Sequence, residues 1–129
     1  MDQLIINGGA PLHGRVEVSG AKNAALGIIA AALLADGIST IENVPCVNDV
    51  RVLIEAIMDL GVKVEYVDQH TIKIDSRNVD KLTVDYEHIK KIRASYYLLG
   101  ALLGRFNKSE VAMPGGCNIG QRPIDQHIK

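Results

Sequence analysis

The 129-residue chain has no tryptophan, one phenylalanine and four tyrosines, so its core must be built from aliphatic side chains. It also lacks a charge excess, with 14 Lys and Arg against 15 Asp and Glu, whereas nucleic-acid-binding domains are normally basic. Its longest apolar run, residues 24–35, is interrupted by Gly27 and is far shorter than the roughly 20 residues that cross a bilayer. These shortages argue against a nucleic-acid partner and against a membrane-spanning protein.

Cysteine is scarce as well: Cys46 and Cys117 lie far apart without a C-x-x-C spacing, which excludes the common zinc and redox motifs. No basic segment followed by an apolar stretch opens the chain, so no signal peptide is expected. We therefore expect a soluble cytoplasmic protein that uses no metal and no other cofactor. Cys46 lacks basic neighbours and is expected to be a small buried hydrophobe.

What the sequence does contain is an alternation of helical and strand patterns. Residues 24–35 have no polar face, which predicts a helix buried on every side. A second helix is expected after Asn48 and Asp49, which can cap it, and should end at Gly61. Its apolar face at helical spacing comprises Val50, Leu53, Ile54, Ile57 and Leu60. The segments expected to form strands are 4–6, 15–19, 38–44, 62–66 and 71–75, the last two as a hairpin.

A second round of the same order follows. Asp85 can cap a long helix, residues 110–113 read as a strand, and Pro123 opens another helix in which the sequence stops. An offset of 69 places Ala32-Leu33-Leu34 on Ala101-Leu102-Leu103, which indicates one unit, repeated. Because the second copy is cut short inside its last helix, we expect the chain to be a piece of a longer protein. The apolar stripe expected on the long helix comprises Ile89, Ile92, Tyr96, Leu99, Leu103 and Phe106.

Lys22 and Asn23 stand at the start of the first helix, where free N–H groups and the helix dipole favour anions. A lysine at this end is opposed by the dipole, which suggests an anionic ligand that contacts both. The alternative, that Lys22 merely extends into water, stays equally open. Arg93 lies off the apolar stripe of its helix and reads most simply as solvated surface.

The loop 114–123 is the strongest local signal. Its three glycines let the backbone approach a ligand closely, and Arg122 offers a planar fork for phosphate ahead of Pro123. In such electropositive surroundings Cys117 should be reactive. A flexible surface loop with an incidental thiol is the competing reading. No carboxylate pair stands out, so a general base would lie outside this chain.

Three stretches, residues 19–26, 92–95 and 114–125, together resemble the family of UDP-N-acetylglucosamine enolpyruvyl transferases, and the resemblance covers the whole chain. The shikimate-pathway enolpyruvyl transferases are similar at the lysine, but they usually have serine after it and lack the loop cysteine. Asn23 and Cys117 therefore favour the first family. The resemblance implies an inside-out α/β barrel of repeated β-α-β-α-β-β units, incomplete here. Residues 1–21 would be first strands belonging to the other domain, and residues 22–129 a partial N-terminal domain.

The resemblance also implies a cytoplasmic transferase that moves the enolpyruvyl group of phosphoenolpyruvate to the 3-hydroxyl of UDP-N-acetylglucosamine, by addition and elimination. Cys117 would be the proton donor, would form an adduct with phosphoenolpyruvate and would be alkylated by fosfomycin; Lys22 and Asn23 would bind phosphoenolpyruvate. The residues implied for the UDP-sugar are Arg93, Arg122, Pro123, Ile124, Asp125 and Gln126.

This reaction is the first committed step of peptidoglycan synthesis, which would connect the protein with the bacterial cell wall, cell shape and cell division. Because the family's catalytic aspartate and a further phosphate-binding arginine lie in later sequence, the 129 residues alone are expected to be inactive. A non-catalytic module that binds a UDP-sugar or phosphate is the alternative from a different class.

Overall fold

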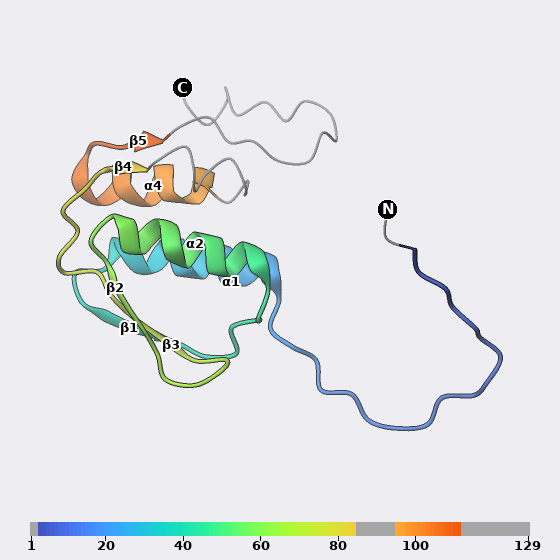
Figure 1. Cartoon of the computed structure of the whole chain (residues 1–129). Helices are drawn as coiled ribbons and strands as arrows, with labels where there is room; N and C mark the ends of the chain where they lie inside the picture. Colours follow the sequence, from blue (N-terminus) through green and yellow to red (C-terminus); the bar gives the residue numbers. More distant parts are fainter. Residues whose placement is uncertain (1–2, 85–94, 112–129) are drawn as a thin grey trace.

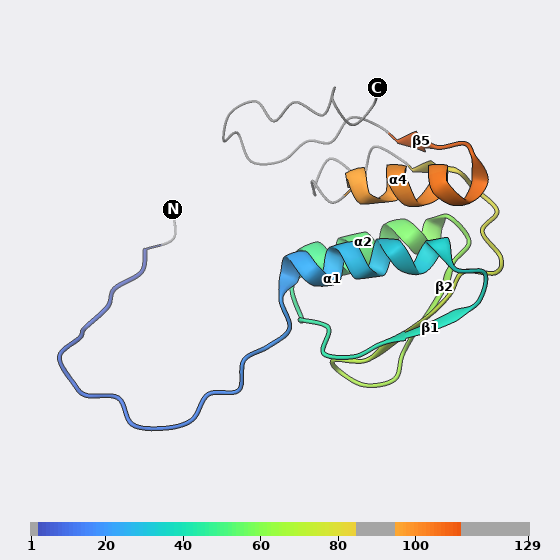
Figure 2. The same cartoon turned by 180° about the vertical axis from the view of Figure 1, so that it is seen from behind.

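The computed structural model describes residues 3–84 and 95–111, and the helices lie between two small sheets (Figures 1 and 2). The elements are, in chain order, α1 Lys22–Ala31, the 3-10 turn η1 Ala32–Leu34, β1 Ile38–Ile41, α2 Asn48–Asp59, β2 Lys63–Tyr66, β3 Ile72–Asp75, β4 Thr83–Val84, α4 Ser95–Phe106 and β5 Glu110–Val111.

The layers follow one another in a simple order. A three-stranded sheet of order β1-β3-β2 covers α1 and α2 on one side, and α4 packs on their other side below the β4–β5 pair (Figure 1). Strand β3 pairs antiparallel with both neighbours, whereas β4 and β5 are parallel. The described residues thus form a mixed α/β fold with its helices inside and no closed barrel, as the incomplete inside-out barrel predicts.

The three-stranded sheet contributes one face to the core. On β3, Ile72 and Ile74 are 1% and 0% exposed beneath the helices, while Lys73 and Asp75 alternate with them on the outer face. This alternation and the β2–β3 pairing confirm the predicted hairpin. Strand β1 ends at Ile41 rather than at the expected residue 44, and the short β4 carries no alternation that would have revealed it.

Helix α2 confirms the predicted apolar face, whose members Val50, Leu53, Ile54, Ile57 and Leu60 are all buried. Its start differs from the prediction, because Val47 is the N-cap residue and no side chain caps the helix. Asn48 and Asp49 instead form its first turn. At the other end Gly61 has φ +94°, and a Cβ there would lie 2.6 Å from the carbonyl oxygen of Asn78. Glycine at this C′ position is therefore required, as predicted.

The prediction that the first helix is buried on every side is wrong for these residues. One face of α1 and η1, including Ile29 and Leu33, is fully buried, but Ile28 and Leu34 on the opposite face are half-exposed. The side that faces α2 and α4 is covered, and no described residue covers the other. Because this helix is apolar all round, its sequence does not show which side packs against the neighbouring elements.

Helix α4 repeats the burial pattern of α1 at the predicted offset of 69. Leu98 and Leu102 are fully buried like their equivalents Ile29 and Leu33, and Leu103 is half-exposed like Leu34. The two copies therefore share their pattern of buried residues as well as their sequence pattern. The stripe predicted for this helix is only partly correct: Phe106 packs against the core, but Leu98, Ala101 and Leu102 are the buried residues, whereas Leu99 is half-buried and Leu103 exposed. Its first members, Ile89 and Ile92, lie outside the described residues.

Residues 3–19 are all exposed and form no strand, so the strands predicted at 4–6 and 15–19 are absent from the structure. A strand needs a neighbour for its backbone N–H and C=O groups, and no described segment pairs with this one. The predicted cap at Asp85 and the helix opened by Pro123 lie outside the described residues.

Candidate functional site

The start of α1 carries the two predicted site residues that the structure describes, Lys22 and Asn23. Ala21 is the N-cap residue, in an extended conformation with no side-chain cap, and Lys22 is the first helical residue. Both predicted residues are exposed. The first turn of α1 therefore presents its N–H groups without a side-chain cap, which is the arrangement that favours an anionic ligand.

A neighbouring helix also begins here. Lys22 Nζ lies 2.8 Å from Asp49 Oδ2, in the first turn of α2, and this ion pair connects the two helix starts. The two side chains are 48% and 38% exposed. Since α1, α2 and α4 all run in the same direction (Figure 1), their positive dipole ends gather at one end of the helix layer.

The sequence analysis missed Asp49 as a partner of Lys22 and predicted it only as a possible cap of the second helix. Instead of capping α2, the carboxylate pairs with the Lys22 ammonium group and offsets its positive charge beside two positive helix ends. Only the knowledge that two successive helices of the unit are parallel, with adjacent starts, would have pointed to this pair.

The path of the chain into this site depends on Gly20. A Cβ at Gly20 would overlap the backbone carbonyl oxygen of Asn43 and would lie 3.3 Å from Cδ of Pro45. Asn43 itself has φ +55°, in the left-handed region, so this connection between β1 and α2 is not easily shifted. The close approach fixes where the chain enters α1, and with it the position of Lys22.

Cys46, predicted to be buried, is exposed. It follows the buried Val44 and Pro45 in the connection that leads to α2, and the two residues after it are exposed as well. Its thiol donates to the carbonyl oxygen of Gln69 at 3.2 Å, and the exposed His70 places Nδ1 3.0 Å from the carbonyl oxygen of Val44. Among the residues that the structure describes, Cys46 is thus an accessible thiol.

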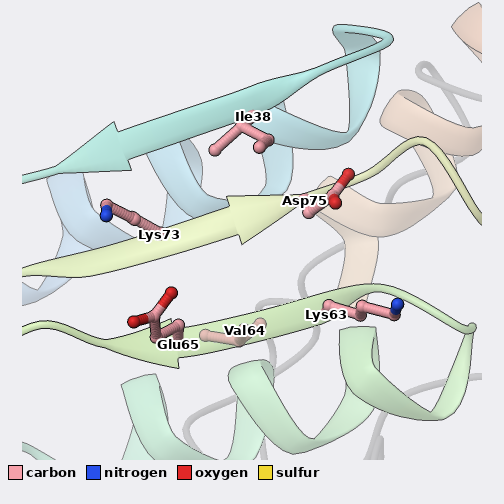
Figure 3. Close-up of a pocket in the computed structure, with 6 residues that line it drawn as sticks. All are labelled: Ile38, Lys63, Val64, Glu65, Lys73 and Asp75. Atoms are coloured by element: carbon pink, nitrogen blue, oxygen red, sulfur yellow. The ribbon is translucent and has the colours of Figure 1, made fainter.

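A shallow depression of about 280 Å³ lies on the outer face of the three-stranded sheet, turned away from the helices (Figure 3). Its charged side chains oppose one another across β2 and β3, Lys63 with Asp75 and Glu65 with Lys73. Two positive and two negative groups cancel, so the depression offers no preference for an anion. We assign no function to it.

The other predicted site residues lie outside the described residues, namely Cys117, Arg93, Arg122, Pro123, Ile124, Asp125 and Gln126. Within residues 3–84 and 95–111, no group of three or more His, Cys, Asp or Glu side chains could hold a metal ion. Over the same residues, none of the helices has the length and hydropathy of a membrane span.

Comparison with known proteins places these features in a family. The family model of EPSP synthase (3-phosphoshikimate 1-carboxyvinyltransferase) matches residues 6–129. UDP-N-acetylglucosamine 1-carboxyvinyltransferase 2 of Clostridium acetobutylicum is 56% identical over the whole chain, and the corresponding enzyme of Clostridium botulinum is 51% identical. The chain spans 31% of the length of each of these two relatives.

A solved structure gives the same result for the fold. The enolpyruvyl transferase NikO from Streptomyces tendae matches with a TM-score of 0.68 and 33% identity, over 77% of this chain and 23% of that one. The predicted resemblance to UDP-N-acetylglucosamine enolpyruvyl transferases is therefore confirmed, and the chain belongs to the EPSP synthase family of 1-carboxyvinyltransferases.

Proposed function

We propose that the protein containing this chain is an enolpyruvyl transferase that moves the enolpyruvyl group of phosphoenolpyruvate to the 3-hydroxyl of UDP-N-acetylglucosamine and releases phosphate. The observation that carries this proposal is the identity of 51–56%, across all of the chain, to relatives named UDP-N-acetylglucosamine 1-carboxyvinyltransferase. Asn23 and Cys117 favour this substrate pair over that of the shikimate-pathway relatives.

Lys22 and Asn23 bind phosphoenolpyruvate in this proposal. Their place at the start of α1, beside the start of α2, supports the role, because two positive helix ends and an ammonium group attract an anion together. The phosphate and carboxylate of phosphoenolpyruvate are the groups that such a site would neutralise.

Cys117 is the proposed proton donor. Its thiol protonates C3 of phosphoenolpyruvate, C2 becomes electrophilic, and the sugar hydroxyl attacks C2 while its own proton passes to a base outside this chain. The tetrahedral ketal then loses a proton from C3 and phosphate from C2, which restores the double bond in the product. Cys117 is also the proposed position of the phosphoenolpyruvate adduct and of alkylation by fosfomycin.

We propose that the UDP-sugar is bound by residues outside the described part of the chain: Arg93, Arg122, Pro123, Ile124, Asp125 and Gln126. Residues 1–21 are assigned to the other domain and 22–129 to a partial N-terminal domain. In the cell the protein would act in the cytoplasm, at the first committed step of peptidoglycan synthesis, and so would serve cell-wall formation, cell shape and division.

The experiment that tests this function is intact mass spectrometry of the full-length protein incubated with fosfomycin, with and without UDP-N-acetylglucosamine. We expect a single adduct that the nucleotide sugar promotes and that peptide mapping places on Cys117. Because Cys46 is exposed, Cys46→Ser is the matched control and should label like the wild type, whereas Cys117→Ser should not label. Labelling of Cys46, or no adduct, would favour the binding-module alternative.

The 129-residue chain alone is proposed to be inactive, because the base and much of the sugar site are assigned to sequence outside it. Phosphate release from phosphoenolpyruvate and UDP-N-acetylglucosamine should be measurable for the full-length protein and absent for the 129 residues. Turnover by the isolated chain would contradict this assignment.

A further inference from the structure

The ion pair between Lys22 and Asp49 joins a flexible side chain to a fixed one. Asp49 precedes the buried Val50, which is 3% exposed, and it belongs to a helix whose apolar face is completely buried. Its carboxylate is therefore held by a rigid element. A lysine side chain has four rotatable bonds, so a ligand that must order it on binding loses affinity to the cost in conformational entropy.

The position of Lys22 is also electrostatically unfavourable without a nearby anion. The ammonium group lies at the positive end of α1, next to the positive end of α2, and the dipole effect at each end opposes a cation. The Asp49 carboxylate, 2.8 Å away, has the sign that both helix starts favour. This contact keeps the ammonium group at the helix starts rather than extended into water.

We propose that Asp49 is a positioning residue for phosphoenolpyruvate binding: it holds the Lys22 ammonium group at the joined starts of α1 and α2. The anion then meets an ammonium group that is already localised, so binding does not have to order the lysine side chain. This inference rests on the proposed function, because it takes phosphoenolpyruvate as the ligand of Lys22. It adds a residue for which neither the sequence pattern nor the comparisons indicated a role in ligand binding.

The test is the substitution Asp49→Asn in the full-length protein, which removes the charge and keeps the shape. We expect KM and Kd for phosphoenolpyruvate to rise by roughly ten- to thirtyfold, the range that corresponds to ordering a lysine side chain on binding. KM for UDP-N-acetylglucosamine should be unchanged, and Asp49→Glu should recover part of the loss because it restores a carboxylate.

A different role for Asp49 predicts a different sign. If the carboxylate only repels the anion, its removal tightens phosphoenolpyruvate binding and lowers KM. If it only stabilises the start of α2, the melting temperature falls while KM and Kd stay at their wild-type values. Either result would overturn the positioning role.

The matched control is Asp59→Asn at the opposite end of the same helix. Asp59 also forms an exposed ion pair, with Lys81 Nζ at 3.3 Å, but it lies at the last residue of α2, whereas Lys22 contacts the first turn. This variant should leave KM for phosphoenolpyruvate unchanged; an effect equal to that of Asp49→Asn would show that any charge removed from α2 suffices, and would overturn the proposal.

Calorimetric binding of phosphoenolpyruvate separates this inference from the proposed function. If the wild type binds phosphoenolpyruvate but does not transfer its enolpyruvyl group, the proposed function fails, and the Kd values of the Asp49 variants still decide the positioning role. If the wild type does not bind phosphoenolpyruvate at all, both proposals are overturned.

Discussion

The two ends of the helix layer differ in how their charged groups are bound. At the end where the helices start, Lys22 and Asp49 form an ion pair whose side chains are 48% and 38% exposed. At the end where they stop, the Arg105 side chain is only 14% exposed. It donates to the carbonyl oxygens of Leu33 and Ser76 at 3.0 and 2.8 Å, and to Asp36 Oδ1 at 2.8 Å.

The difference separates a surface suited to a ligand from a surface that holds the fold together. Leu33 carries one of the carbonyl groups left over at the end of α1 and η1, and Arg105 satisfies it with a charge that the helix dipole also favours. The starts of α1 and α2 have no side-chain caps. At the end where the helices stop, backbone carbonyl groups are thus hydrogen-bonded to Arg105. At the end where they start, the backbone N–H groups of α1 and α2 have no side-chain cap, which suits an anionic ligand.

The contact of Arg105 also connects the two repeats. Asp36 and Arg105 are 69 residues apart, so they occupy equivalent positions, one in each copy. Ser76, completely buried, donates its hydroxyl to the carbonyl oxygen of Ala35 and extends the network to the end of β3. The repeats are therefore joined by polar contacts at this end as well as by the apolar faces of α1 and α4.

The largest expected effect comes from breaking this network with Arg105→Ala. Two buried carbonyl groups lose a charged donor, so the free energy of unfolding should fall by about 3 kcal/mol. Urea unfolding followed by circular dichroism measures the change. The control is Lys108→Ala, whose ion pair with Glu110 is exposed and should be worth less than about 1 kcal/mol. Lys108 lies at the same end of the molecule as Arg105, so equal costs for the two variants would mean that burial does not strengthen a charged contact at this end.

A smaller loss is expected at the other end, from Gly20→Ala. The added Cβ would meet backbone at Asn43, which cannot move aside cheaply, so we expect a cost of about 1–3 kcal/mol and weaker phosphoenolpyruvate binding in the full-length protein, because Lys22 is displaced. Gly27→Ala, inside α1 with nothing within 4 Å of its Cβ, is the control. That variant should gain about 1 kcal/mol from helix propensity. Neutral behaviour of Gly20→Ala would mean that the chain entry tolerates movement.

These contrasts also indicate what the sequence could predict. The apolar face of α2, the hairpin and the repeat offset were correct, because each depends on periodicity within one segment or on two copies of it. The burial of α1 and α4 was predicted less well: Ile28 and Leu103 are as apolar as their buried neighbours, and only packing partners decide which side is covered. The prediction of strands at 4–6 and 15–19 was wrong, because a strand needs a second segment to pair with and the sequence of one segment does not show whether it is present.

For the candidate site, the sequence predicted the place of Lys22 at a helix start but not its partner. Asp49 lies 27 residues away, and its role follows from the parallel arrangement of α1 and α2, which no local pattern encodes. Local patterns did not reveal the contacts of Arg105 and Ser76 either, because these contacts form only where η1, the end of β3 and α4 meet. The sequence therefore indicated which residues carry charge at the site, and the fold determined how they are paired.

The smallest expected effect tests whether burial or location sets the difference between the two ends. Asp75 adjoins Ser76, yet its partner Arg77 is 56% exposed. Hydrogen bonds from the Arg77 side chain and backbone, with a weaker contribution from Lys63, lower the pKa of Asp75 from 3.8 to about 2. Because the folded-state pKa is the lower one, the stabilisation is complete above pH ~3.8 and disappears as the pH falls towards about 2.

Carboxyl NMR titration should place the Asp75 midpoint near 2 in the wild type. Arg77→Ala should raise this pKa towards 3.8, and Lys63→Ala should raise it less, because Lys63 acts only through its charge. Molar salt should also raise the wild-type midpoint, since an exposed pair is screened. If salt left the midpoint unchanged, this pair would behave like a buried one. Nearness to the Arg105 network, rather than exposure, would then govern the strength of charges at this end of the molecule.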